Sequence, residues 1–166
     1  IVDLISVNLR ESERDRFRSR KDLKKNITPE RCFRKYYAND EDYKIVDILF
    51  TYFSSVKQTF LDENSNSYWE FNDTNKPTNV LQTTVGYQAL ILLMIDILKE
   101  LPEDKKDKIS TYSVYLNKAK GIDFEDVGRY PFTSKTKKVL HLDLSLRIWP
   151  PDGQDDRVDQ LNELGS

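Results

Sequence analysis

Residues 83–102 read TTVGYQALILLMIDILKELP, and the rest of the chain has to pack around them. The two threonines can cap a helix by accepting a hydrogen bond from an otherwise unpaired backbone N–H. The closing Leu-Pro ends it, because proline disfavours helical backbone at the residue before it. Ala89 to Ile95 form an unbroken apolar run that is longer than a typical strand and rich in helix formers. The segment is therefore expected to be a central helix at 84–101, buried by other helices on most sides.

Length and composition restrict the class of protein. The 166 residues suit one domain with a sizeable core, and 38% apolar with 33% charged residues is not the composition of a disordered chain. The apolar run is too short to cross a bilayer, and the polar residues Gln88 and Asp96 lie at its two ends. A single cysteine excludes an internal disulfide and is typical of a reducing compartment. We expect a soluble, cytoplasmic chain with no membrane partner and no cofactor.

Further helices are expected on both sides of the central one. Apolar residues at helical spacing form one stripe along 42–60, and a second periodic segment begins at Ile109 and ends at Gly121. A last helix is expected after Thr133-Ser134, ending at Trp149-Pro150. The fold class is therefore all-α, a compact bundle of about five or six helices. The long loop at 61–80 carries three aromatic residues that are expected to hold it on the core, namely Tyr68, Trp69 and Phe71.

Charge divides the chain into three expected parts. Residues 1–27 are expected to form a basic N-terminal arm or helix, and 28–150 the helical domain. Residues 151–166 are expected to form an acidic, flexible tail, with a short docking helix through Val158, Leu161 and Leu164 as the alternative. From Arg10 to Lys35 eleven basic residues face five acidic ones, a net charge of +6 that leaves −8 for the remainder.

The basic segment is the strongest candidate for a binding function. Arginines with aromatic residues among them suit nucleic-acid phosphates and base stacking, although the interspersed acids are also typical of an exposed helix. Lys135, Lys137 and Lys138 add positive charge at the start of the last expected helix. The predicted phosphate contacts are Arg14, Arg16, Arg18, Arg20, Lys21, Lys24, Lys25, Arg31 and Arg34.

The sequence signals for a catalytic, metal-binding or anion-binding site are weaker. Cys32 and His141 would form a nucleophile–base pair only if the fold joined them. Two acidic groups, at 40–42 and at Asp123, Glu125 and Asp126, could hold hydrated Mg²⁺, but capping and solvation explain them as well. Gly86, in the first turn of the central helix, indicates close packing or, less readily, an anion at the helix start.

Three blocks resemble the C-terminal region of the DGQHR-domain family, bacterial proteins related to ParB and sulfiredoxin-like domains. They are YFSSVKQTF at 52–60, LQTTVGYQAL at 81–90, and IDF at 122–124 followed by FTS at 132–134. Together they cover roughly residues 40 to 150. The resemblance implies a prokaryotic protein linked to DNA modification or to defence against foreign DNA.

The family's name-giving motif belongs to an N-terminal domain that this sequence does not include. Asp152-Gly153-Gln154 shares its letters, but Asp155-Asp156 follow where the motif has histidine and arginine, and the position differs. No catalytic residue is therefore carried over.

Two main functions follow as expectations. The first is a non-catalytic helical module of a DNA-associated accessory or regulatory protein. The alternative is a protein-interaction or oligomerisation domain without nucleic-acid binding, with Tyr68, Trp69, Phe71 and Trp149 as an exposed anchor patch. An enzyme fragment using His141, Cys32 or the carboxylates is a third possibility.

Overall fold

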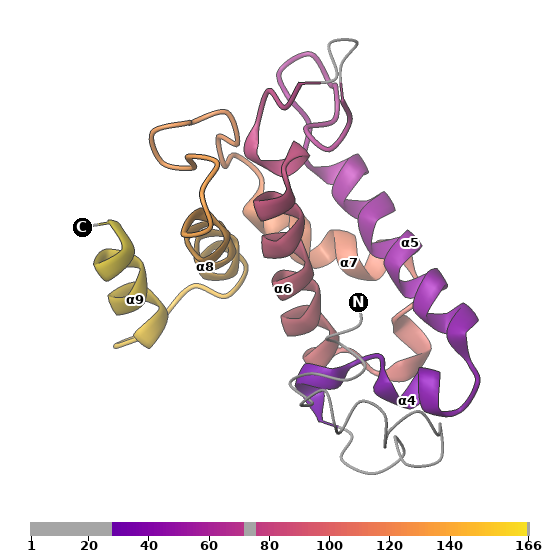
Figure 1. The fold of residues 1–166 in the computed structure, drawn as a ribbon. Coiled ribbons are helices and arrows are strands. Elements are labelled where there is room, and N and C mark those ends of the chain that lie inside the picture. Colours follow the sequence, from indigo (N-terminus) through magenta and orange to yellow (C-terminus); the bar gives the residue numbers. More distant parts are fainter. Residues whose placement is uncertain (1–27, 72–75, 166) are drawn as a thin grey trace, which may run out of the picture. The chain divides into compact units, whose positions relative to one another are not determined.

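The computed structural model describes residues 28–71 and 76–165 (Figure 1). Within these ranges the regular backbone is helical and no strand forms beyond one isolated bridge between Leu61 and Ser67. The all-α prediction is confirmed. The α-helices are α4 (Arg34–Ala38), α5 (Asp42–Thr59), α6 (Thr84–Glu100), α7 (Ile109–Leu116), α8 (Thr136–Ile148) and α9 (Asp156–Gly165). The 3-10 helices are η1 (Pro29–Arg31), η2 (Val80–Gln82), η3 (Glu103–Lys105) and η4 (Asn117–Ala119).

Helix α6 is the predicted central helix, and its bounds agree with the expected 84–101 to within one residue. Its first turn is capped by Thr83, whose Oγ1 accepts a hydrogen bond from the Gly86 N–H at 3.2 Å. The helix is buried along most of its length, as its apolar run requires. Its buried side chains include Ala89, Leu90, Leu93, Met94, Ile97 and Leu98. None of the helices described is long and apolar enough to cross a membrane.

The described part of the chain divides into two units. Of the described residues, unit 1 contains 28–51 and 95–108, and unit 2 contains 52–71, 76–94 and 109–165. The described part of unit 1 contains η1, α4, the first part of α5, the end of α6, and η3. Its buried apolar side chains include Phe33, Tyr36, Ile45, Ile48, Ile97 and Leu98.

In unit 2, the later part of α5 packs against α6 and α7. The buried Tyr52 hydroxyl donates to the Leu90 carbonyl at 2.8 Å, and the Tyr52 ring meets the Tyr112 ring edge-on at 5.4 Å. Ser55 Oγ donates to the Ile109 carbonyl at 3.1 Å. The apolar stripe predicted along 42–60 therefore has its expected partner in α6.

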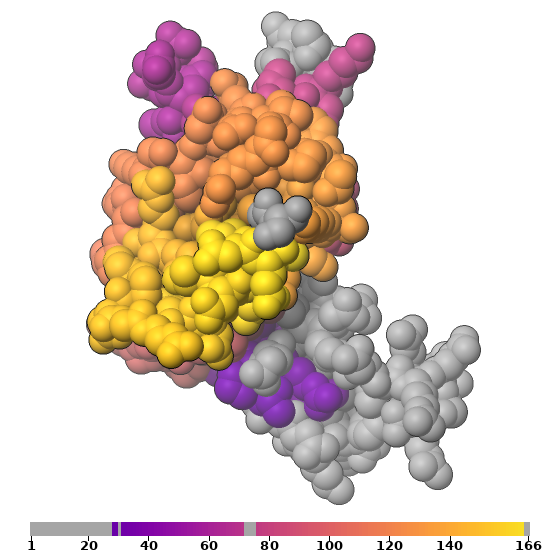
Figure 2. Space-filling model, turned by 90° about the vertical axis from the view of Figure 1, so that its left-hand side faces the viewer, coloured from indigo at the N-terminus to yellow at the C-terminus, as the bar shows by residue number. Residues whose placement is uncertain are grey.

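Helices α8 and α9 lie side by side in unit 2 (Figure 1). The Arg157 guanidinium joins them, because it donates to Ser145 Oγ at 2.9 Å and to the Trp149 carbonyl at 2.8 Å. In Figure 2, α9 in yellow covers part of the surface formed by the orange segment that contains α8. Most of the segment expected to be a flexible tail is thus a docked helix, which was the alternative.

Two of the three aromatic residues predicted to hold the 61–80 loop on the core do so, namely Tyr68 and Trp69, whereas Phe71 is 52% exposed. The Trp69 ring stacks on the Phe53 ring with centroids 4.8 Å apart, and the Tyr68 ring meets the Phe124 ring edge-on at 5.4 Å. Asn79 Nδ2 donates to the Tyr68 carbonyl at 3.0 Å, so a backbone group of the loop is also fixed.

Candidate functional site

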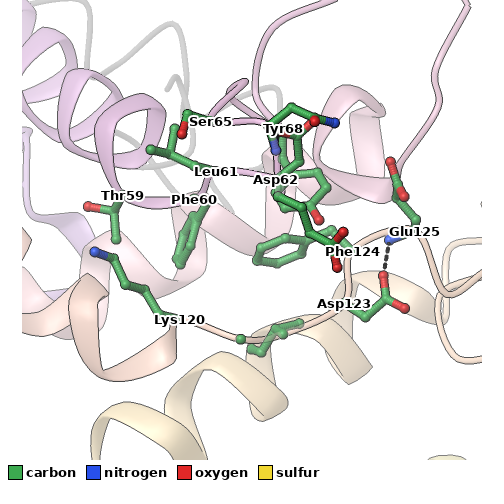
Figure 3. Close-up of a pocket in the computed structure, with 14 residues that line it drawn as sticks. Thr59, Phe60, Leu61, Asp62, Ser65, Tyr68, Lys120, Asp123, Phe124 and Glu125 are labelled. Atoms are coloured by element: carbon green, nitrogen blue, oxygen red, sulfur yellow. Dashed lines mark hydrogen bonds between the residues drawn. The ribbon is translucent and has the colours of Figure 1, made fainter.

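A groove with a volume of about 950 Å³ opens between two loops of unit 2 (Figure 3). One loop follows α5 and the other follows η4. Their separation along the chain is about 60 residues, so only the fold brings them together. The lining residues are Thr59, Phe60, Leu61, Asp62, Glu63, Asn64, Ser65, Tyr68, Lys120, Gly121, Ile122, Asp123, Phe124 and Glu125.

The first loop is a tight turn closed on itself. The Tyr68 N–H donates to the Phe60 carbonyl at 3.0 Å, and the Asp62 N–H donates to the Asn66 carbonyl at 2.8 Å. The Asp62 carboxylate accepts the backbone N–H groups of Asn64 and Asn66, each at 2.8 Å. The Asn66 side-chain amide and these N–H groups hold the pKa of Asp62 below its ordinary value. The turn therefore keeps Asp62 ionised.

The second loop is fixed by a glycine and by one backbone bond. Gly121 has φ of +85°, a conformation that side-chain-bearing residues rarely adopt, and it turns the chain after η4. The Val80 N–H donates to the Phe124 carbonyl at 3.1 Å, which ties the loop to η2. The Asp123 carboxylate accepts the Glu125 N–H at 2.9 Å, the bond drawn dashed in Figure 3. The Asp123 carboxylate consequently keeps a defined place at the groove.

Three aromatic rings form the floor. The Phe60 and Phe124 rings meet edge-on at 5.0 Å, and the Tyr68 ring meets Phe124 in the same manner at 5.4 Å. Phe60 and Phe124 are buried, whereas Tyr68 is half-exposed. The accessible part of the floor is therefore the Tyr68 ring.

The rim is acidic. Four carboxylates line the groove against one ammonium group, that of Lys120. Figure 3 shows Lys120 at the end marked by Thr59, with Asp123 and Glu125 at the opposite end. The pKa of the Tyr68 phenol is raised, first by its burial and then by the charges of these same four carboxylates, Asp62, Glu63, Asp123 and Glu125. One phenol thus experiences negative charge from both loops.

The acidic residues singled out in the sequence are only partly brought together. Asp123 and Glu125 meet Asp62 and Glu63 at the groove, whereas Asp126 does not line it and accepts the Arg129 N–H at 3.0 Å. Among the residues that the structure describes, no group of three or more histidine, cysteine or carboxylate side chains is placed to hold a metal ion. Asp123 and Asp126 accept backbone N–H groups of their own loop, at 2.9 Å from Glu125 and 3.0 Å from Arg129.

Cys32 and His141 belong to different units. Burial raises the pKa of the Cys32 thiol to about 11, against a smaller opposing effect of Lys106. The group is therefore a neutral thiol at physiological pH, which is the unreactive form of cysteine.

The predicted phosphate contacts fall mostly outside the described residues. This holds for Arg14, Arg16, Arg18, Arg20, Lys21, Lys24 and Lys25. Arg31 is half-buried at the end of η1, and Arg34 is only 3% exposed, so its guanidinium is poorly placed to touch a phosphate. Lys135 and Lys138 are exposed at the start of α8.

Sequence reasoning missed Asp62 and Glu63 as members of a site. Both lie in a polar stretch, DENSNS at 62–67, that reads as an ordinary surface turn. Their significance depends on the edge-on contact of Phe60 with Phe124, and a single sequence gives no signal for that pairing.

No family model, curated protein or solved structure matches the chain.

Proposed function

We propose that the chain is a non-catalytic binding module that receives a positively charged segment of a partner protein in its acidic groove. The observation that carries the proposal is the convergence at one groove of four carboxylates from two loops, all of which act on the Tyr68 phenol. Lysine and arginine side chains are attracted both by carboxylates and by the face of an aromatic ring. A groove of about 950 Å³ is large enough for such side chains.

The state of the carboxylates favours binding over acid catalysis. A general acid at neutral pH needs a pKa raised by burial or by a neighbouring charge. Asp62 has the opposite shift, since its hydrogen bonds lower the pKa. Asp62 and Asp123 also use their oxygens to accept N–H groups of their own loops. They act as fixed negative charges, which suits recognition of a cation.

Fluorescence anisotropy with a labelled peptide of alternating lysine and glycine tests the proposal. Binding should weaken steeply with added salt, because the attraction is between exposed charges. The paired substitutions Asp123→Asn and Glu125→Gln keep the side-chain shapes and remove two charges. We expect them to weaken binding about tenfold, at roughly 0.7 kcal/mol per charge.

Asp152→Asn is the matched control, because this exposed carboxylate does not line the groove. It should leave the affinity unchanged. Equal losses in the control and the groove variant would show a non-specific attraction and contradict the proposal. Equal binding of a peptide of alternating glutamate and glycine would also contradict the proposal. So would displacement of the lysine peptide by a simple polyamine added at the same concentration of positive charge.

A second candidate, also proposed here, is contact with nucleic-acid phosphates through the basic N-terminal segment. Its support is the net charge of +6 between Arg10 and Lys35, in a chain whose overall charge is −2. The acidic groove would repel phosphates, so this contact would use another surface. The resemblance to DGQHR-domain proteins adds a context, a bacterial cytoplasmic protein linked to DNA modification or phage defence.

Gel shifts with duplex and single-stranded DNA across a salt series test this second candidate. Replacing Arg14, Arg16, Arg18 and Arg20 by glutamine should reduce both the affinity and the slope of its salt dependence. Binding that ignores salt, or that survives these four substitutions, would contradict it.

A further inference from the structure

One end of the acidic groove of unit 2 is positively charged. Lys120 is the only cation among the described residues that line the groove. Figure 3 shows it at the end marked by Thr59, whereas Asp123 and Glu125 lie at the other end. The Lys120 side chain is exposed, and its ammonium group forms no ion pair or hydrogen bond with any residue that the structure describes. Its charge is therefore available to an occupant of the groove.

Thr59, the last residue of α5, brings a second hydrogen-bond donor to the groove. The residue is only 5% exposed, yet its hydroxyl has no hydrogen-bond partner among the described residues. The hydroxyl is not sealed in the interior, because every fully buried polar side-chain atom in the described part of the chain has a partner. Polar groups of nearly buried residues are normally paired, so an unpaired one at a groove indicates a place for a polar atom of a ligand.

The backbone beside Lys120 leaves room for such an atom. Gly121 also lines the groove, and no atom lies within 4 Å of a Cβ built on it. An ammonium group and a hydroxyl both donate hydrogen bonds, and a carboxylate accepts from both at once. The Lys120 end of the groove therefore suits a carboxylate, while the end with Asp123 and Glu125 suits a cation.

We propose that the partner's chain ends in this groove, at a C-terminal lysine or arginine whose α-carboxylate lies at Lys120 and Thr59. This rests on the proposed function of the groove and adds which part of the partner binds. The side-chain cation of the same residue would lie at Asp123 and Glu125. An internal segment with basic residues alone would leave Lys120 facing positive charge, which disfavours binding. A terminal residue carries both charged groups, so fewer side chains have to be ordered than if a second residue supplied the carboxylate.

Fluorescence anisotropy with two peptides of alternating glycine and lysine tests the proposal. Both end in lysine, one with a free C-terminal carboxylate and the other with a C-terminal amide. The amide peptide has the larger positive charge, so it would bind more tightly if the groove attracted charge alone. We expect the opposite, with the free carboxylate peptide binding at least fivefold more tightly. Lys120→Met should abolish this preference, and Thr59→Val, which removes the hydroxyl and keeps the shape of the side chain, should reduce it.

Lys138→Met is the control, because Lys138 is an exposed lysine of the same unit that does not line the groove. It should leave the preference unchanged. The proposal is overturned if the amide peptide binds as tightly as the free carboxylate peptide, or if the two methionine variants behave alike. It is also overturned if an amidated peptide with glutamate after its last lysine binds as tightly, because the chain end would then not be recognised.

The joint substitution Asp123→Asn with Glu125→Gln separates this proposal from the function on which it rests. If both peptides bind the parent equally and both are weakened by this substitution, the groove binds basic segments but does not recognise a chain end. If neither peptide binds the parent, the proposed function fails, and the recognition of a C-terminal residue fails with it.

Discussion

Gly86 of α6 lies directly against the backbone of Val80 in η2. A Cβ atom at Gly86 would stand 2.0 Å from the Val80 carbonyl oxygen and 2.8 Å from the Leu81 Cα. Both contacts are with backbone, which cannot move aside as a side chain does. The close approach of η2 to the first turn of α6 thus requires glycine, and the packing interpretation of this residue is supported over an anion site.

Gly86→Ala should therefore destabilise the chain, although alanine is the better helix former. Alanine in place of glycine normally gains about 0.5–1 kcal/mol within a helix. Here the overlap with Val80 should outweigh that gain and give a net loss of about 2 kcal/mol. Urea unfolding measures the difference. Gly153→Ala is the control, because no atom lies within 4 Å of the added Cβ; an equal effect of both substitutions would contradict the packing argument.

Tyr52→Phe should lower the free energy of unfolding by about 1–2 kcal/mol. The substitution removes the hydroxyl that donates to the Leu90 carbonyl at 2.8 Å and leaves that carbonyl without this bond in a buried place. Tyr43→Phe removes the same hydroxyl from an exposed ring and should change stability by less than about 0.5 kcal/mol. If Tyr52→Phe left the free energy of unfolding unchanged, the α5–α6 contact would not depend on this hydrogen bond.

Glu103 should make unit 1 sensitive to acid. Partial burial raises the pKa of its carboxyl, but hydrogen bonds from Lys106, Lys35 and Tyr36 outweigh this and lower the pKa to about 2. Because the folded pKa lies below the ordinary value of 4.5, the stabilisation is present above pH 4.5 and is lost as the pH falls towards 2. The side chain is 58% exposed, so solvent screening limits the effect to about 1 kcal/mol.

Glu103→Gln checks this by denaturant unfolding between pH 2 and pH 7. The variant should be less stable than the parent at neutral pH, and the two curves should meet near pH 2. Glu100→Gln, at the exposed end of α6, should run parallel to the parent. If Glu103→Gln and the parent differed in unfolding free energy by the same amount at every pH, the lowered pKa of Glu103 would be contradicted.

Arg157 should control whether α9 stays docked on α8. Its guanidinium reaches Ser145 Oγ and the Trp149 carbonyl while Asp155 accepts from its Nε at 3.0 Å. Arg157→Lys keeps the charge but loses the planar fork that makes these bonds together. We expect the α9 amides to exchange hydrogen about tenfold faster, since charged hydrogen bonds contribute about 1.5–3 kcal/mol. Arg147→Lys, an exposed arginine of α8, should not change the rate.

The helices were predictable where the signals are local. The apolar run and its proline gave the bounds of α6, and the stripe along 42–60 gave those of α5. Helix α9 was harder, because its mostly polar sequence shows only Val158, Leu161 and Leu164 as apolar anchors. Its docking depends on Arg157 finding Ser145 on another helix, and such a contact leaves no pattern in a single sequence.

The candidate site was the least predictable part. Asp123 and Glu125 were recognisable as an acidic pair, but their companions Asp62 and Glu63 lie about 60 residues away. Likewise, the stripe predicted along α5 marked the buried face correctly through Ile45 and Ile48. The stripe did not predict that Phe50 is exposed to solvent, because the exposure of a side chain depends on where the neighbouring elements end.

The central claim is that the acidic groove binds a basic segment, and nuclear magnetic resonance titration tests it most directly. The lysine–glycine peptide is added to the isotope-labelled chain and the amide shifts are followed. Shifts should concentrate at residues 59–68 and 120–125 and disappear in the Asp123→Asn, Glu125→Gln variant. Shifts spread evenly over the acidic residues of the chain, or an unchanged pattern in that variant, would contradict it.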